Sequence, residues 1–392
     1  MLTSKVVLGA ALLGSTLIGC GDNLKGPHAC SETSGNACVW AGKGGVDGFN
    51  GDGLDRRETE LYWTMDMTFA PDGTAWFIDW NNHLVRHVLE DDTVETIVGW
   101  IDPIFPGDGL PGMAEKTAEG ALGLDVKLNH PTDLVAEPDG KILVMAWHNH
   151  KLREIDPTTK HVRILAGGGA GFAGDGMPMA MAVFKQPKGL SADAAGNLYI
   201  LDQQNFRIRK VEKATGMMST IAGNGMQGYE GDNGPALMAK LNFEAGSNPE
   251  PSGGLAIGTG KIFISDTLSN RIRVIDTATM MITTFAGTGV EGGAGDGGPA
   301  ISAQVAHPRD LEIGPDGNLY IADTDNNRIR MIDLATNVIS TVVGSGDLGL
   351  DATDDMPATS MKLARPFGIE FDAAGDLYVA DTINSRILKV YR

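Results

Sequence analysis

The chain has 392 residues and a formal net charge of −19 at pH 7. Binding to nucleic acid depends on clustered Lys and Arg, and the sequence contains no such cluster, so no nucleic-acid partner is expected. Hydrophobic residues make up 42% of the chain, enough for a large core, and the 53 glycines lack the strict period of collagen.

The first segment has the features of an export signal. Lys5 is followed by an apolar stretch, 6–19, that is too short to span a membrane comfortably and ends directly before Cys20. The sequence LIGC at 17–20 resembles a bacterial lipobox. This resemblance implies a lipoprotein signal peptide over 1–19, lipidation of Cys20, and attachment to the bacterial cell envelope, at the outer membrane or the periplasmic face, through the lipid alone. An ordinary secretory signal and a buried helix are the alternatives.

The next segment, 20–36, is expected to be a tether between the anchor and the folded domain. Cys30 and Cys38 are the remaining cysteines. In an exported chain they are most simply explained by a short-loop disulfide, since oxidising compartments favour disulfides. Two buried thiols are the weaker alternative.

Six similar segments follow, over 37–392. Each carries a glycine at the end of an apolar, β-favouring run: Gly42, Gly99, Gly167, Gly223, Gly287 and Gly344. Each copy also has short alternating runs separated by turn residues, such as 189–193, 197–202, 207–212 and 219–223, and this pattern predicts strands. Regular repetition of four antiparallel strands predicts an all-β, six-bladed β-propeller.

The two ends of the repeat region predict how the ring closes. The last copy stops after its third strand, at 387–391, and the missing fourth-strand sequence stands at 37–42. Pairing of these two segments completes the sixth four-stranded blade and removes the open edges of the ring.

Blocks such as 308–333, with the pattern P-x-D-L…G-N-L-Y-I-A-D-x-x-N-x-R-I-R, are similar to the NHL-repeat family. The resemblance covers nearly all of 37–392 and implies a six-bladed propeller. It says little about function, because NHL domains include interaction platforms, RNA-binding modules, adhesion proteins and the peptidylglycine-amidating lyase.

Three loops, 223–228, 287–292 and 344–349, match G-x-G-x-x-G. A dinucleotide site needs one such loop, opening a helix in a βαβ unit, so we interpret the repeated glycines as turns with φ > 0. The aspartate that follows, as in Asp296, is expected to cap a brief helix rather than to bind calcium. The aspartates that end the second strands, as in Asp323, are expected to satisfy donors within their own blades.

Breaks in the repeat provide the candidate site residues. Asp66, Asp133 and Asp310 take a place near the start of the first strand where the other copies have glycine, and Glu312 lies nearby. Three carboxylates at the mouth of a channel suit a hard cation or a cationic ligand. If the protein has a cofactor, calcium is the expected one. The alternative is that they cap turns.

Histidines supply the second candidate set. His130, His148 and His307 lie near the ends of expected strands in two copies. Three imidazoles could form a zinc site, as the resemblance to the amidating lyase suggests, but that enzyme's histidine motifs are not recognisable here. A solvated or stacking role is therefore the favoured interpretation.

The sequence assigns no catalytic residue, since it contains no G-x-S-x-G elbow and no supported Ser/His/Asp set. We expect a monomeric, exported, lipid-anchored scaffold that binds an unknown protein or small-molecule ligand through its loop-rich face. The alternative is a metal-dependent hydrolase or lyase with calcium or zinc at the channel mouth.

Overall fold

The computed structural model describes residues 30–100, 114–247, 249–351, 353 and 355–392. The chain divides into two compact units, Met1–Ser31 and Glu32–Arg392, of which the second holds the fold. The expected signal peptide and the lipidation site Cys20 lie outside the described residues. No helix in the described part of the chain is long and apolar enough to cross a membrane.

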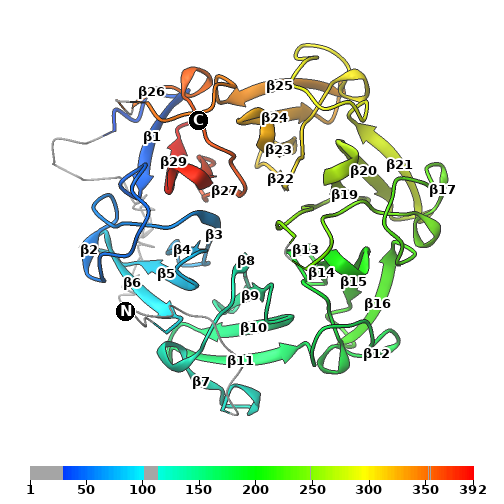
Figure 1. The fold of residues 1–392 in the computed structure, drawn as a ribbon, viewed down its shortest axis with the longest axis horizontal. Coiled ribbons are helices and arrows are strands. Elements are labelled where there is room, and N and C mark those ends of the chain that lie inside the picture. The colour runs from blue at the N-terminus through cyan, green and yellow to red at the C-terminus, as the bar shows by residue number, and fades with distance from the viewer. Residues whose placement is uncertain (1–29, 101–113, 248, 352, 354) are drawn as a thin grey trace, which may run out of the picture. The chain divides into compact units, whose positions relative to one another are not determined.

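Residues 32–392 form six antiparallel sheets arranged as blades around a central channel (Figure 1). The first three blades, from inner to outer strand, are β3 (Thr64–Phe69), β4 (Ala75–Asp79), β5 (Leu84–Val88) and β6 (Thr93–Val98); β8 (Pro131–Ala136), β9 (Ile142–Ala146), β10 (Lys151–Asp156) and β11 (His161–Ala166); and β13 (Gly189–Ala192), β14 (Leu198–Asp202), β15 (Arg207–Val211) and β16 (Met217–Ala222). The other three are β18 (Leu255–Gly258), β19 (Lys261–Asp266), β20 (Arg271–Asp276) and β21 (Met281–Ala286); β22 (Asp310–Ile313), β23 (Leu319–Asp323), β24 (Arg328–Asp333) and β25 (Val338–Val343); and β27 (Ile369–Phe371), β28 (Leu377–Asp381), β29 (Arg386–Val390) and β1 (Asn36–Ala41). The all-β six-bladed prediction is confirmed.

Most blades carry a fifth, two-residue strand outside the four that the sequence predicts. These strands are β2 (Leu54–Asp55), β7 (Ala121–Leu122), β12 (Met177–Pro178), β17 (Gly234–Pro235) and β26 (Met356–Pro357). In the fifth blade a single bridge, Pro299 to Val338, takes this place. The connection from the preceding blade passes along the outer edge and covers it. A pairing of two residues is too short to show the alternation by which strands are recognised.

Short 3-10 helices occupy the connections: η1 (Ala114–Lys116), η2 (Gly123–Asp125), η3 (Met179–Met181), η4 (Gln203–Asn205), η5 (Ala236–Met238), η6 (Thr267–Ser269), η7 (Ala300–Ser302), η8 (Thr324–Asn326), η9 (Ala358–Ser360) and η10 (Thr382–Asn384). Asp296 does not cap η7, because Pro299 holds the N-cap position and no side chain bonds there. The capping prediction is therefore wrong for this copy.

The ring closes as the sequence predicts. β1 pairs antiparallel with β29, and its register places Ala37 opposite Val390 and Val39 opposite Leu388. The N-terminal strand therefore completes the sixth blade. Cys38 in β1 takes part in a disulfide, whereas its pairing with Cys30 stays a prediction because Cys30 lies outside the unit 32–392.

The apolar core lies in layers between neighbouring blades rather than at one centre. One layer joins Ile78 and Val85 of the first blade to Leu134 and Val144 of the second. Alternate residues of each strand point to opposite faces, and both faces of a blade pack on neighbours. The central strands are therefore buried throughout, as in β23 and β28.

Buried ion pairs hold each of several blades to the loop that precedes it, and the loop aspartates take part in these pairs instead of capping helices. Asp323, at the end of β23, accepts hydrogen bonds from the Ala306 N–H at 2.8 Å and from Asn326 at 2.8 Å, and lies 3.4 Å from Arg330. The fully buried Arg330 also pairs with Asp296 at 2.6 Å. The same set recurs as Asp79–Arg86–Asp52, Asp202–Arg209–Asp175 and Asp266–Arg273–Asp232. The aspartates therefore stabilise their own blades, as the sequence predicts for those that end the second strands.

The glycine loops have the turn role predicted for them. Gly287 has φ +90°, and a Cβ there would lie 2.5 Å from the carbonyl oxygen of Asn270. Gly223 and Gly344 have φ +85° and +95° and face the same kind of contact. Glycine is therefore required because the chain leaves the outer strand against the backbone of the same blade.

Candidate functional site

The upper face is the side of the ring that carries the connections between blades and the turns between second and third strands. A repeated contact joins neighbouring blades on this face at five of the six blade boundaries. The Nδ1 atom of His83 accepts the N–H of His130 at 2.9 Å, and both residues have left-handed backbones. Equivalent pairs are His150–Gln186, Asn270–His307, Asn327–Arg365 and Ser385–Trp63. In these five blades a residue shortly before the first strand is thereby held to the preceding blade.

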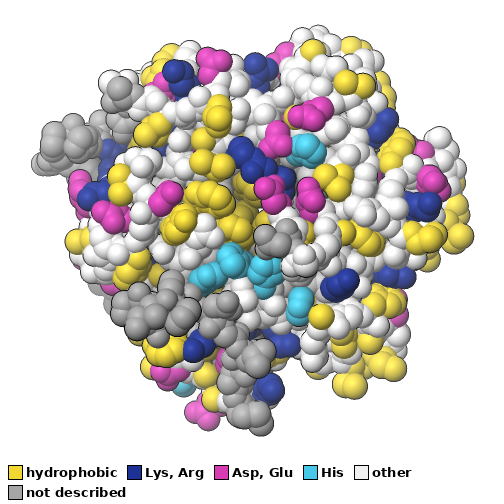
Figure 2. Space-filling model, viewed as in Figure 1, with side chains coloured by type: hydrophobic (Ala, Val, Ile, Leu, Met, Phe, Trp, Pro, Cys, Tyr) yellow, Lys and Arg dark blue, Asp and Glu magenta, His cyan; other side chains and the backbone are white. Residues whose placement is uncertain are grey.

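Aromatic and imidazole rings gather on the upper face over the first two blades. Trp63 and Trp80 lie parallel with centroids 6.0 Å apart, Trp80 contacts His130 at 4.5 Å, and Trp147 stacks on His148 at 4.0 Å. We call this set, with Tyr62 and His83, the aromatic–histidine patch. Figure 2 shows histidine side chains in a row on this face beside hydrophobic ones. Tyr62 is 36% exposed, so the patch reaches solvent.

The patch histidines form one hydrogen-bonded group. The Nδ1 atoms of His130 and His148 lie 3.2 Å apart, and Asn129 Oδ1 lies 2.7 Å from the first and 3.2 Å from the second. Burial, and then the neighbouring His83 and His148, lower the pKa of His130 to about 3. His130 is therefore neutral at physiological pH and presents an uncharged ring.

His307 stands apart from the patch in an ionic group. Its Nδ1 pairs with Asp325 at 2.6 Å, and Asp325 also binds Arg365 at 2.8 Å. The hydrogen bond to Asp325 raises the pKa of His307 above its ordinary value. Although burial opposes the shift, the bonds from His307 and Arg365 lower the pKa of Asp325 to about 2. The structure thus unites His130 with His148 but not with His307.

Arg365 also reaches a second carboxylate on the upper face. Glu250 Oε2 lies 2.8 Å from Arg365 and 2.6 Å from Arg309, which is 2% exposed. Arg309 further donates to the carbonyl of Pro251 and packs over Phe367 at 4.9 Å. These two guanidiniums and one glutamate come from three neighbouring blades, so their approach cannot be read from local sequence spacing.

The three channel aspartates tie neighbouring blades together. Asp66 accepts the N–H of Leu134 at 2.9 Å, and Asp310 accepts that of Ile369 at 3.0 Å. Asp133 likewise accepts a backbone hydrogen bond from Leu190. Where a neighbouring blade's main chain comes close, the copy has glycine instead: a Cβ on Gly254 would lie 2.6 Å from the Cα of Asp310. Each aspartate thus links two inner strands.

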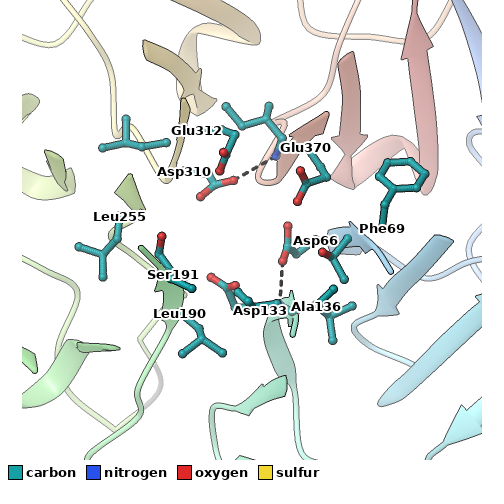
Figure 3. Close-up of a pocket in the computed structure, with 16 residues that line it drawn as sticks. Asp66, Phe69, Asp133, Ala136, Leu190, Ser191, Leu255, Asp310, Glu312 and Glu370 are labelled. Carbon is teal, nitrogen blue, oxygen red and sulfur yellow. Dashed lines mark hydrogen bonds between the residues drawn. The ribbon is translucent and has the colours of Figure 1, made fainter. Parts of the chain in front are cut away.

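Figure 3 shows the carboxylates pointing into the channel from different blades, where they line a cavity of about 210 Å³. Glu312 and Glu370 join the three aspartates. Burial, with the neighbouring Asp310, raises the pKa of Asp66 to about 7, and burial raises the pKa of Glu370 to about 8. Burial also raises the pKa of Asp133, Asp310 and Glu312. The cluster therefore holds protons at neutral pH.

Two buried cationic residues lie next to the carboxylate cluster. Arg309 directly precedes Asp310, and Lys188 directly precedes Gly189; both cationic side chains are buried. Lys188 Nζ donates to the Arg309 carbonyl at 3.1 Å and approaches Asp133 at 4.0 Å. A site at the channel mouth stays a prediction.

The described residues contain no group of three or more His, Cys, Asp or Glu that could hold a metal ion. The carboxylates are held by backbone N–H groups of the next blade, and two of the three expected zinc ligands face each other while the third is paired with Asp325. The geometry does not support the calcium or three-histidine zinc hypotheses.

The sequence pointed to His130 and His148 but not to the aromatic residues around them, nor to the Arg309–Glu250–Arg365 group. Overall aromatic content is 6%, which hides the fact that three of the 6 tryptophans, Trp63, Trp80 and Trp147, gather in one place. A usable signal existed: Trp63 and His130 hold the same place before the first strand of successive copies. No comparable signal marks Glu250.

With the geometry described, the chain can be compared with known proteins. It is a six-bladed β-propeller similar in sequence to NHL repeat-containing proteins. It is 28% identical to the protein SUPPRESSOR OF QUENCHING 1 of Arabidopsis thaliana over 277 residues, covering 68% of this chain and 24% of that protein. It is 25% identical to NHL repeat-containing protein 2 of Homo sapiens over 311 residues, covering 70% of this chain and 40% of that protein. The chain thus spans less than half the length of these relatives. No family model matches the chain.

Solved structures share the fold. A structural genomics protein of unknown function from Bacteroides thetaiotaomicron aligns with a TM-score of 0.62 at 18% identity, covering 90% of this chain and 75% of that one. An auxiliary nutrient binding protein from Bacteroides ovatus aligns with a TM-score of 0.59 at 13% identity, covering 90% and 76%. At these identities the likeness concerns the propeller architecture.

Proposed function

We propose that this chain is an NHL-type propeller that acts as a scaffold and binds a protein or small-molecule ligand through its upper face. The observation that carries the proposal is the aromatic–histidine patch, where Tyr62, Trp63, Trp80 and Trp147 gather with His130 and His148. Tyr and Trp dominate the energetically important centres of interfaces, because they bury much area with little side-chain entropy. The described nutrient binding of the Bacteroides ovatus protein is consistent with a binding role.

The proposal includes export and anchoring through Cys20 in the bacterial cell envelope, as the lipobox-like sequence indicates. A metal-dependent hydrolase or lyase has less support, because no group of three or more His, Cys, Asp or Glu in the described residues could hold a metal ion.

The test is capture from the native envelope. The full chain in mild detergent is immobilised, and partners that it retains are compared with those retained by a Tyr62→Ser/Trp63→Ala variant. We expect the variant to lose the partner, because these rings are at the solvent edge of the patch. Met238→Ala is the matched control, since Met238 is 68% exposed on η5 and away from the patch. Equal capture by the patch variant and the control would refute the proposal.

A further inference from the structure

We propose that Arg309 and Arg365 form a binding site for a ligand carboxylate, and that Glu250 occupies it as an internal substitute. The inference rests on the proposed function, because it names a chemistry that the upper face would recognise. Both guanidiniums converge on one oxygen, Glu250 Oε2, at 2.6 and 2.8 Å, and a second Arg365 nitrogen lies 3.4 Å from Oε1. Paired guanidinium forks are the arrangement by which proteins bind carboxylates.

Glu250 satisfies this pair incompletely. The Nε atom of Arg309 is buried and has no hydrogen-bond partner among the described residues, although the side chain is only 2% exposed. A carboxylate that approached Arg309 in the usual bidentate manner, across Nε and one terminal nitrogen, would satisfy this donor. Glu250 instead shares its Oε2 between the two arginines, and its Oε1 contacts Arg365 alone.

Exchange of Glu250 for another carboxylate requires little movement. The backbone of Glu250 is held in place, since Gln203 donates to the carbonyl oxygens of Glu244 and Glu250 at 3.0 and 2.9 Å and accepts the Ser252 N–H at 3.1 Å. The Glu250 side chain, in contrast, is 51% exposed. Rotation of this side chain alone would therefore open the two guanidiniums to a ligand.

The local charge requires an anion at this position. Arg309 cannot lose its proton at physiological pH, so a buried guanidinium without a partner anion would be strongly unfavourable. Lys188 and His307 lie close by, through the Arg309 carbonyl and the Asp325 carboxylate respectively. With Glu250 rotated away, Asp325 still pairs with Arg365, but this carboxylate is already shared with His307.

The experiment removes the internal competitor and measures carboxylate binding directly. Calorimetry on the full chain in mild detergent compares the wild type with Glu250→Gln and with Glu250→Asp, a second variant that keeps the charge but shortens the reach. The probes are acetate and N-acetyl-glycylglycine with its terminal carboxylate; the C-terminal amide of that peptide is the control ligand. Glu291→Gln, an exposed change of the same charge, is the control variant.

We expect both Glu250 variants to bind the carboxylate probes about tenfold or more tightly than the wild type, because a tethered competitor acts at a millimolar or higher effective concentration. Adding Arg365→Gln should abolish the gain. Binding of acetate alone would indicate small carboxylates as the source, and preferential binding of the peptide acid would indicate a chain terminus. Unchanged affinity in both folded variants, or equal binding of the amide, would overturn the inference. Capture through the patch would be unaffected by that outcome, so the two proposals can fail separately.

Discussion

Asp66 accepts the N–H of Leu134 across the boundary between the first and second blades, at 2.9 Å. The bond uses one carboxylate oxygen and leaves the group in the channel with four further carboxyl groups, those of Asp133, Asp310, Glu312 and Glu370. A single carboxyl thus serves both to join blades and to crowd the channel with acid. This double role makes the stability of the ring sensitive to pH.

The first prediction concerns that sensitivity. In the folded chain the pKa of Asp66 is raised to about 7 and that of Glu370 to about 8, so the folded state binds more protons than the unfolded state between about pH 4 and pH 8. These two groups therefore contribute stability that is lost as pH rises through this window. Since one pKa unit corresponds to about 1.4 kcal/mol, we expect the unfolding temperature to drop by at least several degrees from pH 5 to pH 8, as measured by calorimetry.

Glu370→Gln checks the assignment to the channel. Glutamine keeps the shape but cannot ionise, so the variant should lose less stability on going from pH 5 to pH 8 than the wild type. Glu291→Gln, at an exposed position, serves as the control and should follow the wild-type profile. A parallel shift of both variants would show that the channel carboxyls do not set the pH dependence.

The second prediction concerns the buried ion pairs. Arg330→Met removes the partner of Asp323, which is fully buried, and of Asp296. We expect a loss of about 3–5 kcal/mol in the free energy of unfolding, because an unpaired buried carboxylate remains. Arg392→Met is the control: Arg392 pairs with Asp316 at the surface, and exposed pairs contribute at most about 1 kcal/mol. Denaturant titration measures both, and equal losses would contradict the role of Arg330.

The third prediction tests the glycine loops. Gly287→Ala places a Cβ 2.5 Å from the Asn270 carbonyl at φ +90°, whereas Gly297→Ala, at φ +78°, meets nothing within 4 Å. The control should cost about 1 kcal/mol from backbone strain alone, and the Gly287 variant clearly more. Thermal unfolding of the two variants separates these effects. Equal losses in the two variants would contradict the steric role of Gly287.

Blade number, ring closure and the turn role of the glycines were predictable from the sequence, because each follows from local periodicity repeated six times. The partners of Asp296 were not: the arginine that it binds, Arg330, lies on the third strand of the same copy, and only the folded sheet brings the two together. The same holds for Glu250, whose arginines belong to two other blades. Likewise, the sequence shows Trp80 and Trp147 but does not show that the fold brings them together.

The pairing of β1 with β29 also has a consequence for biosynthesis. These strands are the first and the last of the described sheets, so the ring cannot be finished until the whole chain has been made. Contacts between such distant segments slow folding, because a very long loop must close. Any product that ends before β29 would expose the edge of β28 to pairing with other chains. Such a fragment would be prone to aggregation and would be a substrate for chaperones and proteases.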